Sequence, residues 1–306
     1  MRIGTLLKNK RRAKQRRKEE SLLQRQETKL RIQQLTEHTL HSKTPGTRNN
    51  SDHEIVISLT TFDKRIESTY IAVESLMQQS FQADRIVLCI SKQDFSEADI
   101  PATLKKQQSR GLEILFCEED LGPYTKYFYT VQKYPNSIVI TVDDDFIYPP
   151  YLVDQLYRAF LKNPHAIHCH RSHKMRFSKT GQLAPYKEWH WDHVDSSPSL
   201  LIFPTGVGGV LYFPGCLDID VINKDAFLKR CPNADDIWLK AMSLKKGIQC
   251  AQVKDCRPWS SRFLPIEGTQ EFSLKRENKK NGTGNDHKIK CVFDHYDLWA
   301  QLEGSK

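Results

Sequence analysis

Short apolar runs alternate with amphipathic stretches between about residue 54 and residue 162 of this 306-residue chain. Four runs have the length and composition of buried strands: Ile55–Leu59, Ile86–Ile90, Ile114–Cys117 and Ile138–Val142. Strands that are apolar throughout and separated by helices are typical of a largely parallel, doubly wound sheet. The pattern therefore predicts an α/β fold of the Rossmann-like kind, with helices on both faces of the sheet.

The segments between these runs predict the helices. They are a helix from Ile66 to Met77, Ala102–Ser109, Lys126–Tyr134, and a helix that Pro150 starts. The last of these has an apolar face formed by Val153, Leu156, Tyr157, Phe160 and Leu161. In the less regular second half, Asp235–Lys246 predicts one more helix, with Gly247 as its stop.

The chain divides by composition near residue 50. Residues 1–50 predict a basic arm, helical over Glu19–Leu35, with a linker at His41–Asp52. Residues 51–306 form the predicted α/β domain. It consists of a regular first half, about 54–162, and a less regular second half, about 163–300.

The net charge of +9 is confined to the arm. Residues 1–50 hold fourteen Lys or Arg and four Asp or Glu, which leaves residues 51–306 at −1. A near-neutral body argues against a nucleic-acid groove in the domain. The dense patch at residues 8–18 has three interpretations: contact with an anionic membrane surface, sequence-independent nucleic-acid binding, or a solvated arm.

No apolar run is long enough to cross a bilayer, and the basic N-terminus lacks the apolar region of a secretory signal. The sequence therefore predicts a cytoplasmic protein, with peripheral contact to the inner membrane face as an option.

The segment Asp143–Asp145 directly follows the fourth predicted strand. Ligands of open α/β sheets bind beyond the carboxyl ends of the strands. If the chain stays extended, Asp143 and Asp145 face the same way and can share one Mn²⁺ or Mg²⁺, since hard cations prefer oxygen ligands. The alternative is a solvated acidic turn that caps the following helix.

The segment Ile140–Pro150 resembles the D-x-D segment of bacterial glycosyltransferases of the GT-A fold, family 2-like. Four other stretches resemble the same group in the same order: Ser58–Phe62 with Arg65, Asp120–Pro123 with Lys126, Gly206–Tyr212, and Ala234–Leu239. The resemblance covers about residues 54–300, and it implies a donor-binding half at about 54–162 and an acceptor half at about 163–300. It implies a GT-A-like fold and a nucleotide-diphosphate sugar donor, most often UDP-linked. It also implies a glycan or lipid-linked glycan acceptor in cell-surface polysaccharide synthesis.

The resemblance also implies roles for individual residues. The donor-binding set is Thr60, Thr61, Arg65, Asp120, Lys126, Asp144, Gly208 and Gly209, and the metal set is Asp143, Asp145 and His287. Thr60, Thr61 and Arg65 have the alternative of a helix cap with a surface arginine, and Asp120 that of a turn around Gly122. Lys126 could be a solvated helix residue. The glycines could form a β-bulge, and His287 could be a lone surface histidine. His287, or Asp286 in its place, follows a polar tail from residue 270 that predicts a mobile loop over the donor.

By the same resemblance, the catalytic base lies in the acidic pair Asp235-Asp236. We choose Asp236, with Asp235 close behind, because an inverting transferase needs a group that takes the proton of the acceptor hydroxyl. The alternative is that both residues serve the start of their helix, where aspartate satisfies free N–H groups.

Several aromatic and histidine residues are assigned by the sequence neither to the site nor to the core. Trp238 either lines a sugar pocket or packs in the core, and packing is favoured. Trp189 and Trp191 either stack on sugars or pack. His168 and His170, in the cluster from His165 to His173, form a possible metal pair that we rank below ordinary packing.

Two functions of other classes compete with glycosyl transfer. A metal-dependent nucleotidyltransferase can also use a carboxylate pair beyond an α/β sheet, although no early Gly-rich loop with a following lysine is present. A non-enzymatic nucleic-acid-binding protein would use the basic arm, and its binding would depend steeply on salt.

Overall fold

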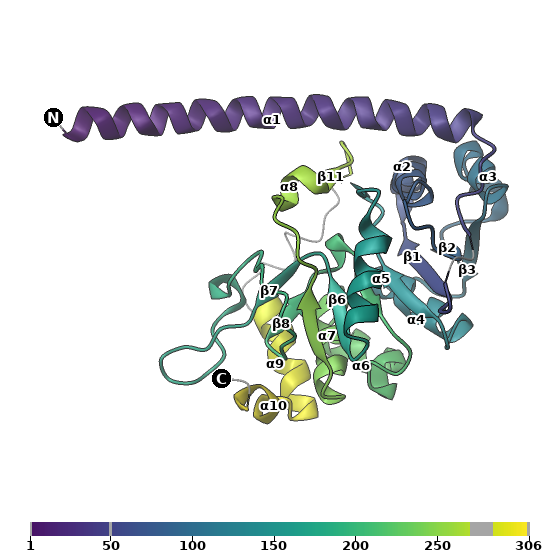
Figure 1. The fold of residues 1–306 in the computed structure, drawn as a ribbon. Coiled ribbons are helices and arrows are strands. Elements are labelled where there is room, and N and C mark those ends of the chain that lie inside the picture. The colour runs from purple at the N-terminus through teal and green to yellow at the C-terminus, as the bar shows by residue number, and fades with distance from the viewer. Residues whose placement is uncertain (1, 49–50, 270–283, 305–306) are drawn as a thin grey trace.

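The computed structural model describes residues 2–48, 51–269 and 284–304 (Figure 1). Within these ranges the central sheet has seven strands in the order β10-β6-β9-β4-β1-β2-β3. They are β1 Ile55–Thr60, β2 Arg85–Ser91, β3 Leu112–Cys117, β4 Ile138–Thr141, β6 Ala166–Cys169, β9 Val210–Tyr212 and β10 Gln249–Gln252. Neighbours are parallel except at β9, which runs antiparallel to β4 and β6. The predicted largely parallel α/β fold is confirmed.

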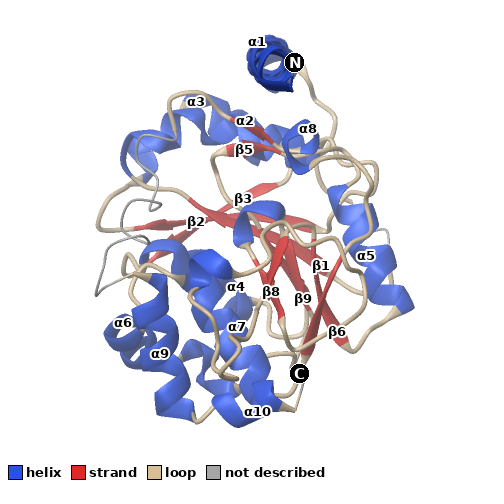
Figure 2. Ribbon diagram, turned by 90° about the vertical axis from the view of Figure 1, so that its left-hand side faces the viewer, coloured by secondary structure: helices blue, strands red, loops and turns tan. Residues whose placement is uncertain are grey.

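Helices cover both faces of this sheet (Figure 2). On one face lie α2 Ile66–Met77, α3 Ala102–Gln108, α5 Leu152–Lys162 and the short α8 Trp259–Arg262. On the other lie α4 Thr125–Lys133, α6 Lys224–Arg230, α7 Asp235–Lys245, α9 Asn285–Tyr296 and α10 Trp299–Glu303. Side chains of β1 alternate between the two: Ile55, Ile57 and Leu59 pack with α2 and α5, whereas Val56 packs on the opposite face.

Two short strand pairs stand apart from the central sheet. β5 Phe146–Ile147 pairs with β11 Leu264–Pro265, and β7 Ser172–Lys174 pairs with β8 Ile202–Pro204. The first follows the acidic segment directly. The second leads into the glycine segment at residues 206–209, so both pairs border the predicted site.

Two details of the predicted helices are wrong. The helix expected to start at Pro150 begins at Leu152, since Tyr151 still has a non-helical backbone (φ −110°, ψ 11°). Its apolar face is also narrower than expected, because Leu161 is 55 % exposed while Val153, Leu156, Tyr157 and Phe160 are buried. Core packing of Trp238 is confirmed, since it is fully buried and its Nε1 donates to the Val221 carbonyl at 3.0 Å.

The N-terminal arm is a single helix, α1 Arg2–His41, much longer than the segment Glu19–Leu35 expected from the sequence. At 1.5 Å per residue it is about 60 Å long. Figure 1 shows it lying across α2 and α3, with its N-terminal end beyond the domain. Leu35 is fully buried in a cluster with Ile71, Ala72, Ile147, Leu264 and Ile266. No helix in the described ranges combines the length and the apolar character that a membrane span requires.

A buried ionic hub fastens α1 to the domain. Glu74 of α2 is fully buried and accepts hydrogen bonds from Arg110 at 2.7 and 3.0 Å. Thr39 of α1 and Gln107 of α3 each donate to the same carboxylate at 3.0 Å, and His38 Nδ1 lies 2.6 Å from it. The second half of α1 is therefore part of the packed structure.

Candidate functional site

The acidic segment leaves the sheet at the carboxyl end of β4 and turns at once. The structure has a turn at Asp144 and Asp145 before β5 begins. The Tyr148 hydroxyl fixes this turn, because it accepts from the backbone N–H of Asp143 at 2.7 Å and donates to its carbonyl at 3.0 Å. The expectation that the chain stays extended through Asp145 is therefore wrong. The turn directs Asp143 to one buried cation, and Asp144 and Asp145 to another.

Arg65 is the cation that holds Asp144 and Asp145. It ends a 3-10 turn after β1 and is only 9 % exposed. Its Nη2 lies 2.5 Å from Asp144 Oδ1 and 3.0 Å from Asp145 Oδ2. Thr61 adds a bond of 2.6 Å from its hydroxyl to Asp144 Oδ2. The alternative of a surface arginine is wrong, because a buried arginine with two carboxylate partners has a fixed position.

Thr60 is placed differently from Thr61. Its hydroxyl donates to the backbone carbonyl of Cys89 on β2 at 2.8 Å. This bond links the ends of two neighbouring strands, so Thr60 supports the edge of the sheet on which Thr61 and Arg65 stand.

Lys126 is the second buried cation. Its side chain is 4 % exposed, and its Nζ lies 2.7 Å from Asp143 Oδ1 and 3.2 Å from Asp235 Oδ2. Burial alone would lower the pKa of Lys126, but the charges of Asp143 and Asp235 raise it well above its ordinary value. The alternative of a solvated helix residue is wrong. Lys126 joins the acidic turn to the start of α7.

Asp236 lies in the first turn of α7 and is bonded to a different segment. Its Oδ1 accepts from the backbone N–H of Gly206 at 2.8 Å. Gly206–Gly208 forms a 3-10 turn between β8 and β9. A Cβ on Gly208 would lie 2.9 Å from the backbone N of Arg171, and Gly209 has a positive φ of 82°. Gly208 therefore requires glycine for a close approach between chain segments, and Gly209 requires it for its backbone conformation.

Five carboxylates gather around the two cations: Asp143, Asp144, Asp145, Asp235 and Asp236. Burial raises the pKa of Asp144 to about 7, with Asp145 and Asp143 adding to the rise while Arg65 and Thr61 oppose it. Burial, followed by the charge of Asp235, raises the pKa of Asp236 to about 8. The site holds more negative charge than Arg65 and Lys126 neutralise, so it suits a further cation.

A divalent ion at this edge would need ligands from a substrate or water in addition to carboxylates. Among the described residues, no group of three or more His, Cys, Asp or Glu side chains is arranged to hold a metal. Mg²⁺, however, is usually bound by one or two carboxylates together with substrate phosphates and water. Asp143 and Asp145 offer the hard oxygen atoms that Mn²⁺ or Mg²⁺ would use in that mode.

Two predicted site residues have other surroundings. Asp120 is exposed, and its Oδ1 accepts from the backbone N–H of Gly122 at 2.7 Å, so it shapes the turn before α4. His287 is exposed in the first turn of α9, and its ring nitrogen lies 3.4 Å from Cys291 Sγ. Most of the loop expected before it, residues 270–283, lies outside the described residues.

The buried histidines pack separately. His168 Nε2 is 2.9 Å from the Asn163 carbonyl, and His170 Nε2 is 3.1 Å from the Leu152 carbonyl. Ring nitrogens that bond to two different backbone carbonyls do not form a metal pair. The packing interpretation of these two histidines is confirmed.

Sequence reasoning missed Arg171 and Tyr148. The Arg171 carbonyl accepts from the Thr205 N–H at 3.0 Å and so holds the glycine segment, while Tyr148 holds the acidic turn. Arg171 was missed because its bonds join residues that are far apart in the sequence. Tyr148 was missed because a run of tyrosine and prolines gives no local signal for a role in the turn.

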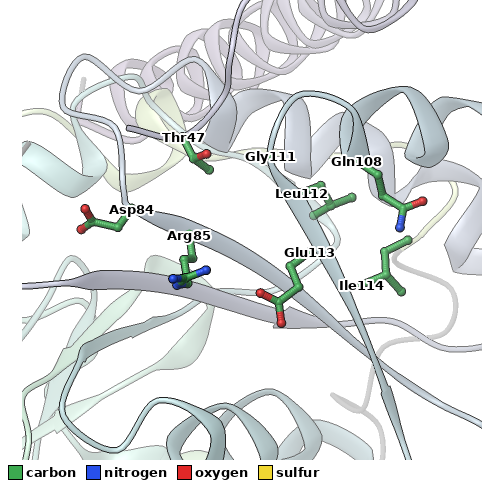
Figure 3. A pocket seen from close by; sticks show the side chains of 8 residues that line it. All are labelled: Thr47, Asp84, Arg85, Gln108, Gly111, Leu112, Glu113 and Ile114. Carbon is green, nitrogen blue, oxygen red and sulfur yellow. The ribbon is translucent and has the colours of Figure 1, made fainter. Parts of the chain in front are cut away.

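The described chain also contains a cavity of about 500 Å³ at another place (Figure 3). It is lined by Thr47, Asp84, Arg85, Gln108, Gly111, Leu112, Glu113 and Ile114. These residues lie at the amino ends of β2 and β3, the edge of the sheet opposite to the acidic turn. We place the candidate site at the carboxyl edge, since the buried charges and their bonds gather there.

No protein-family model and no curated protein matches the chain. Solved structures give distant likenesses. Residues 1–349 of S. aureus TarS in complex with UDP are 12 % identical, with a TM-score of 0.45 over 79 % of this chain and 70 % of that one. CMP:2-keto-3-deoxy-manno-octonic acid synthetase complexed with CTP is 14 % identical, with a TM-score of 0.39 over 66 % and 90 %. At these values the likenesses assign the chain neither a family nor an activity.

Proposed function

We propose that this protein is a glycosyltransferase that moves a sugar from a nucleotide-diphosphate sugar, UDP-linked, to a glycan or lipid-linked glycan acceptor. The observation that carries the proposal is the assembly of five carboxylates and two buried cations at the carboxyl edge of β1 and β4. This edge of an open α/β sheet is where ligands bind. Buried titratable groups with strongly shifted pKa values are typical of active sites.

The donor would lie against the cations and hydroxyls of this edge. Arg65 and Lys126 would offset part of the carboxylate charge beside a diphosphate, and Thr61 and Asp144 would supply hydrogen-bonding groups for ribose or sugar. Gly208 and Gly209 would act through the close packing that fixes their segment beside the donor sugar. Asp120 and Thr60 act through the turn and the strand end that they fix.

Asp143 and Asp145 would hold Mn²⁺ or Mg²⁺ beside the donor phosphates. When bound there, the ion would supply positive charge that stabilises the leaving nucleotide. Asp236 takes the proton of the attacking acceptor hydroxyl, and a base is most effective when its pKa lies near the working pH. Asp235 keeps Lys126 in place next to Asp236.

The wider setting follows from the same proposal. The acceptor would belong to cell-surface polysaccharide synthesis, and the basic residues 8–18 of α1 would attract the anionic inner face of a membrane at about 1 kcal/mol per basic residue. Binding of anionic but not neutral lipid vesicles, lost on deletion of residues 2–18, tests this part independently of catalysis.

The reaction class is tested with a panel of nucleotide-sugars and Mn²⁺, by measuring release of free nucleoside diphosphate without acceptor. We expect slow release from one donor, abolished by EDTA and restored by added Mn²⁺. Asp145→Ala should reduce release at least tenfold, since it removes both a cation ligand and a partner of Arg65.

Glu97→Ala is the matched control, because Glu97 is an exposed acid outside the site, and it should behave as the unaltered protein. Release of nucleoside diphosphate that is insensitive to EDTA would contradict the proposed metal requirement. Release of pyrophosphate from a nucleoside triphosphate, with no nucleoside diphosphate from any donor, would instead establish nucleotidyl transfer.

A further inference from the structure

Trp191 is an exposed aromatic ring held in place by other rings. Its side chain is 46 % exposed, whereas the neighbouring Trp189 is 4 % exposed and donates from Nε1 to the Ala184 carbonyl. The ring centroid of Trp191 lies 4.4 Å from that of His173 and 5.5 Å from that of Tyr186. A large apolar ring that is fixed on one side and open on the other is suited to receive a ligand.

Three hydrogen bonds, joined through the chain itself, connect the loop of Trp191 with the candidate base. Asp192, the next residue in the chain, accepts from Arg171 Nε at 2.7 Å. The Arg171 carbonyl accepts from the Thr205 N–H at 3.0 Å. The adjacent Gly206 donates its N–H to Asp236 at 2.8 Å. Trp191 and Asp236 thus belong to one connected framework.

Tyr186 and Asn285 are polar groups close to the ring. Burial raises the pKa of Tyr186, and the nearby charge of Asp236 adds to the rise, which places the tyrosine hydroxyl within electrostatic reach of that carboxylate. The side chain of Asn285 is hydrogen-bonded to the same hydroxyl. Tyr186 therefore connects the ring of Trp191 with the candidate base.

We propose that Trp191 is the stacking platform for a pyranose ring of the acceptor. The indole face covers the apolar C–H face of the sugar, and one of the sugar hydroxyls is presented to Asp236. This inference rests on the proposed glycosyl transfer and names the acceptor class as a pyranoside. A cavity of about 560 Å³ beside the same loop, lined in part by His190 and His193, leaves room for further units of a glycan.

The test compares four proteins: unaltered, Trp191→Ala, Trp191→Phe and Val194→Ala. Val194 is 63 % exposed on the same loop and serves as the control. Each protein, saturated with UDP, is titrated calorimetrically with α- and β-methyl glycosides of glucose, galactose and N-acetylglucosamine. Donor hydrolysis without acceptor is measured in parallel.

We expect the unaltered protein to bind at least one glycoside. Trp191→Ala should weaken that binding, and raise the acceptor KM, about tenfold or more, as is common when an anchoring tryptophan is truncated. Trp191→Phe should restore most of the affinity, and Val194→Ala should change nothing. Donor hydrolysis should stay within about twofold in all four proteins.

Two results would overturn the proposed role of Trp191 as a stacking platform. They are unchanged glycoside affinity in Trp191→Ala, and no binding of any glycoside by the unaltered protein. Neither affects the proposed function, which fails separately if no donor is hydrolysed. Equal loss of donor hydrolysis and glycoside binding in Trp191→Ala would show a general structural role instead.

Discussion

Asp236→Asn is expected to lower kcat for sugar transfer by about 10²–10⁴-fold, the usual contribution of a positioned general base. Asparagine has the same shape and retains an oxygen that can accept from the Gly206 N–H. The substitution therefore removes the ability to take a proton while leaving the glycine segment in place. The measurement is a single-turnover assay with saturating donor and acceptor.

Donor affinity separates this role from a structural one. Calorimetric binding of the nucleotide-sugar to Asp236→Asn should stay within about threefold of the unaltered protein, since Asp236 is not among the proposed donor contacts. Asp235→Asn is the matched comparison and should weaken donor binding, because it removes a partner of Lys126. A nearly normal kcat in Asp236→Asn would exclude it as the base.

Glu74→Gln is expected to lower the free energy of unfolding by about 3–5 kcal/mol, the cost of breaking a buried ion pair by removing one partner. Arg110 would remain buried opposite a neutral amide, and the bonds from Thr39 and His38 of α1 would weaken. Urea unfolding monitored by circular dichroism provides the measurement.

The control for this loss is Glu118→Gln. Glu118 is 75 % exposed and pairs with Lys92 at the surface, so its removal should cost no more than about 1 kcal/mol. Equal stabilities of Glu74→Gln and Glu118→Gln would show that the hub contributes nothing beyond a surface pair.

The same hub around Glu74 should make the free energy of unfolding depend on pH in the acidic range. Burial opposes ionisation of Glu74, but hydrogen bonds from Arg110 and Gln107 and the charge of Arg110 lower its pKa from 4.5 to about 2. Because the folded-state pKa is depressed, the stabilisation is fully present above about pH 4.5 and is lost as the pH falls toward 2. Stability measured between these values should fall less steeply in Glu74→Gln, and an identical slope would contradict the assignment.

Local patterns in the sequence determined the framework of this protein. The apolar runs at Ile55–Leu59 and Ile138–Val142 became neighbouring parallel strands, because a run that is apolar on both faces must be covered on both faces. The position of Asp143–Asp145 after the second of these runs placed carboxylates at the ligand-binding edge of the sheet. Strand, helix and edge follow from the order of residues over short distances.

Only the tertiary structure decided the partners within that framework. The ion pair between Lys126 and Asp143 crosses 17 positions, and the bond from Thr61 to Asp144 crosses 83. It is likewise tertiary packing that buries Arg65, exposes Trp191 beside a buried Trp189, and docks the second half of α1 onto α2. Periodicity reports which face of an element is apolar, whereas the neighbour of a charged side chain depends on how separate elements pack together.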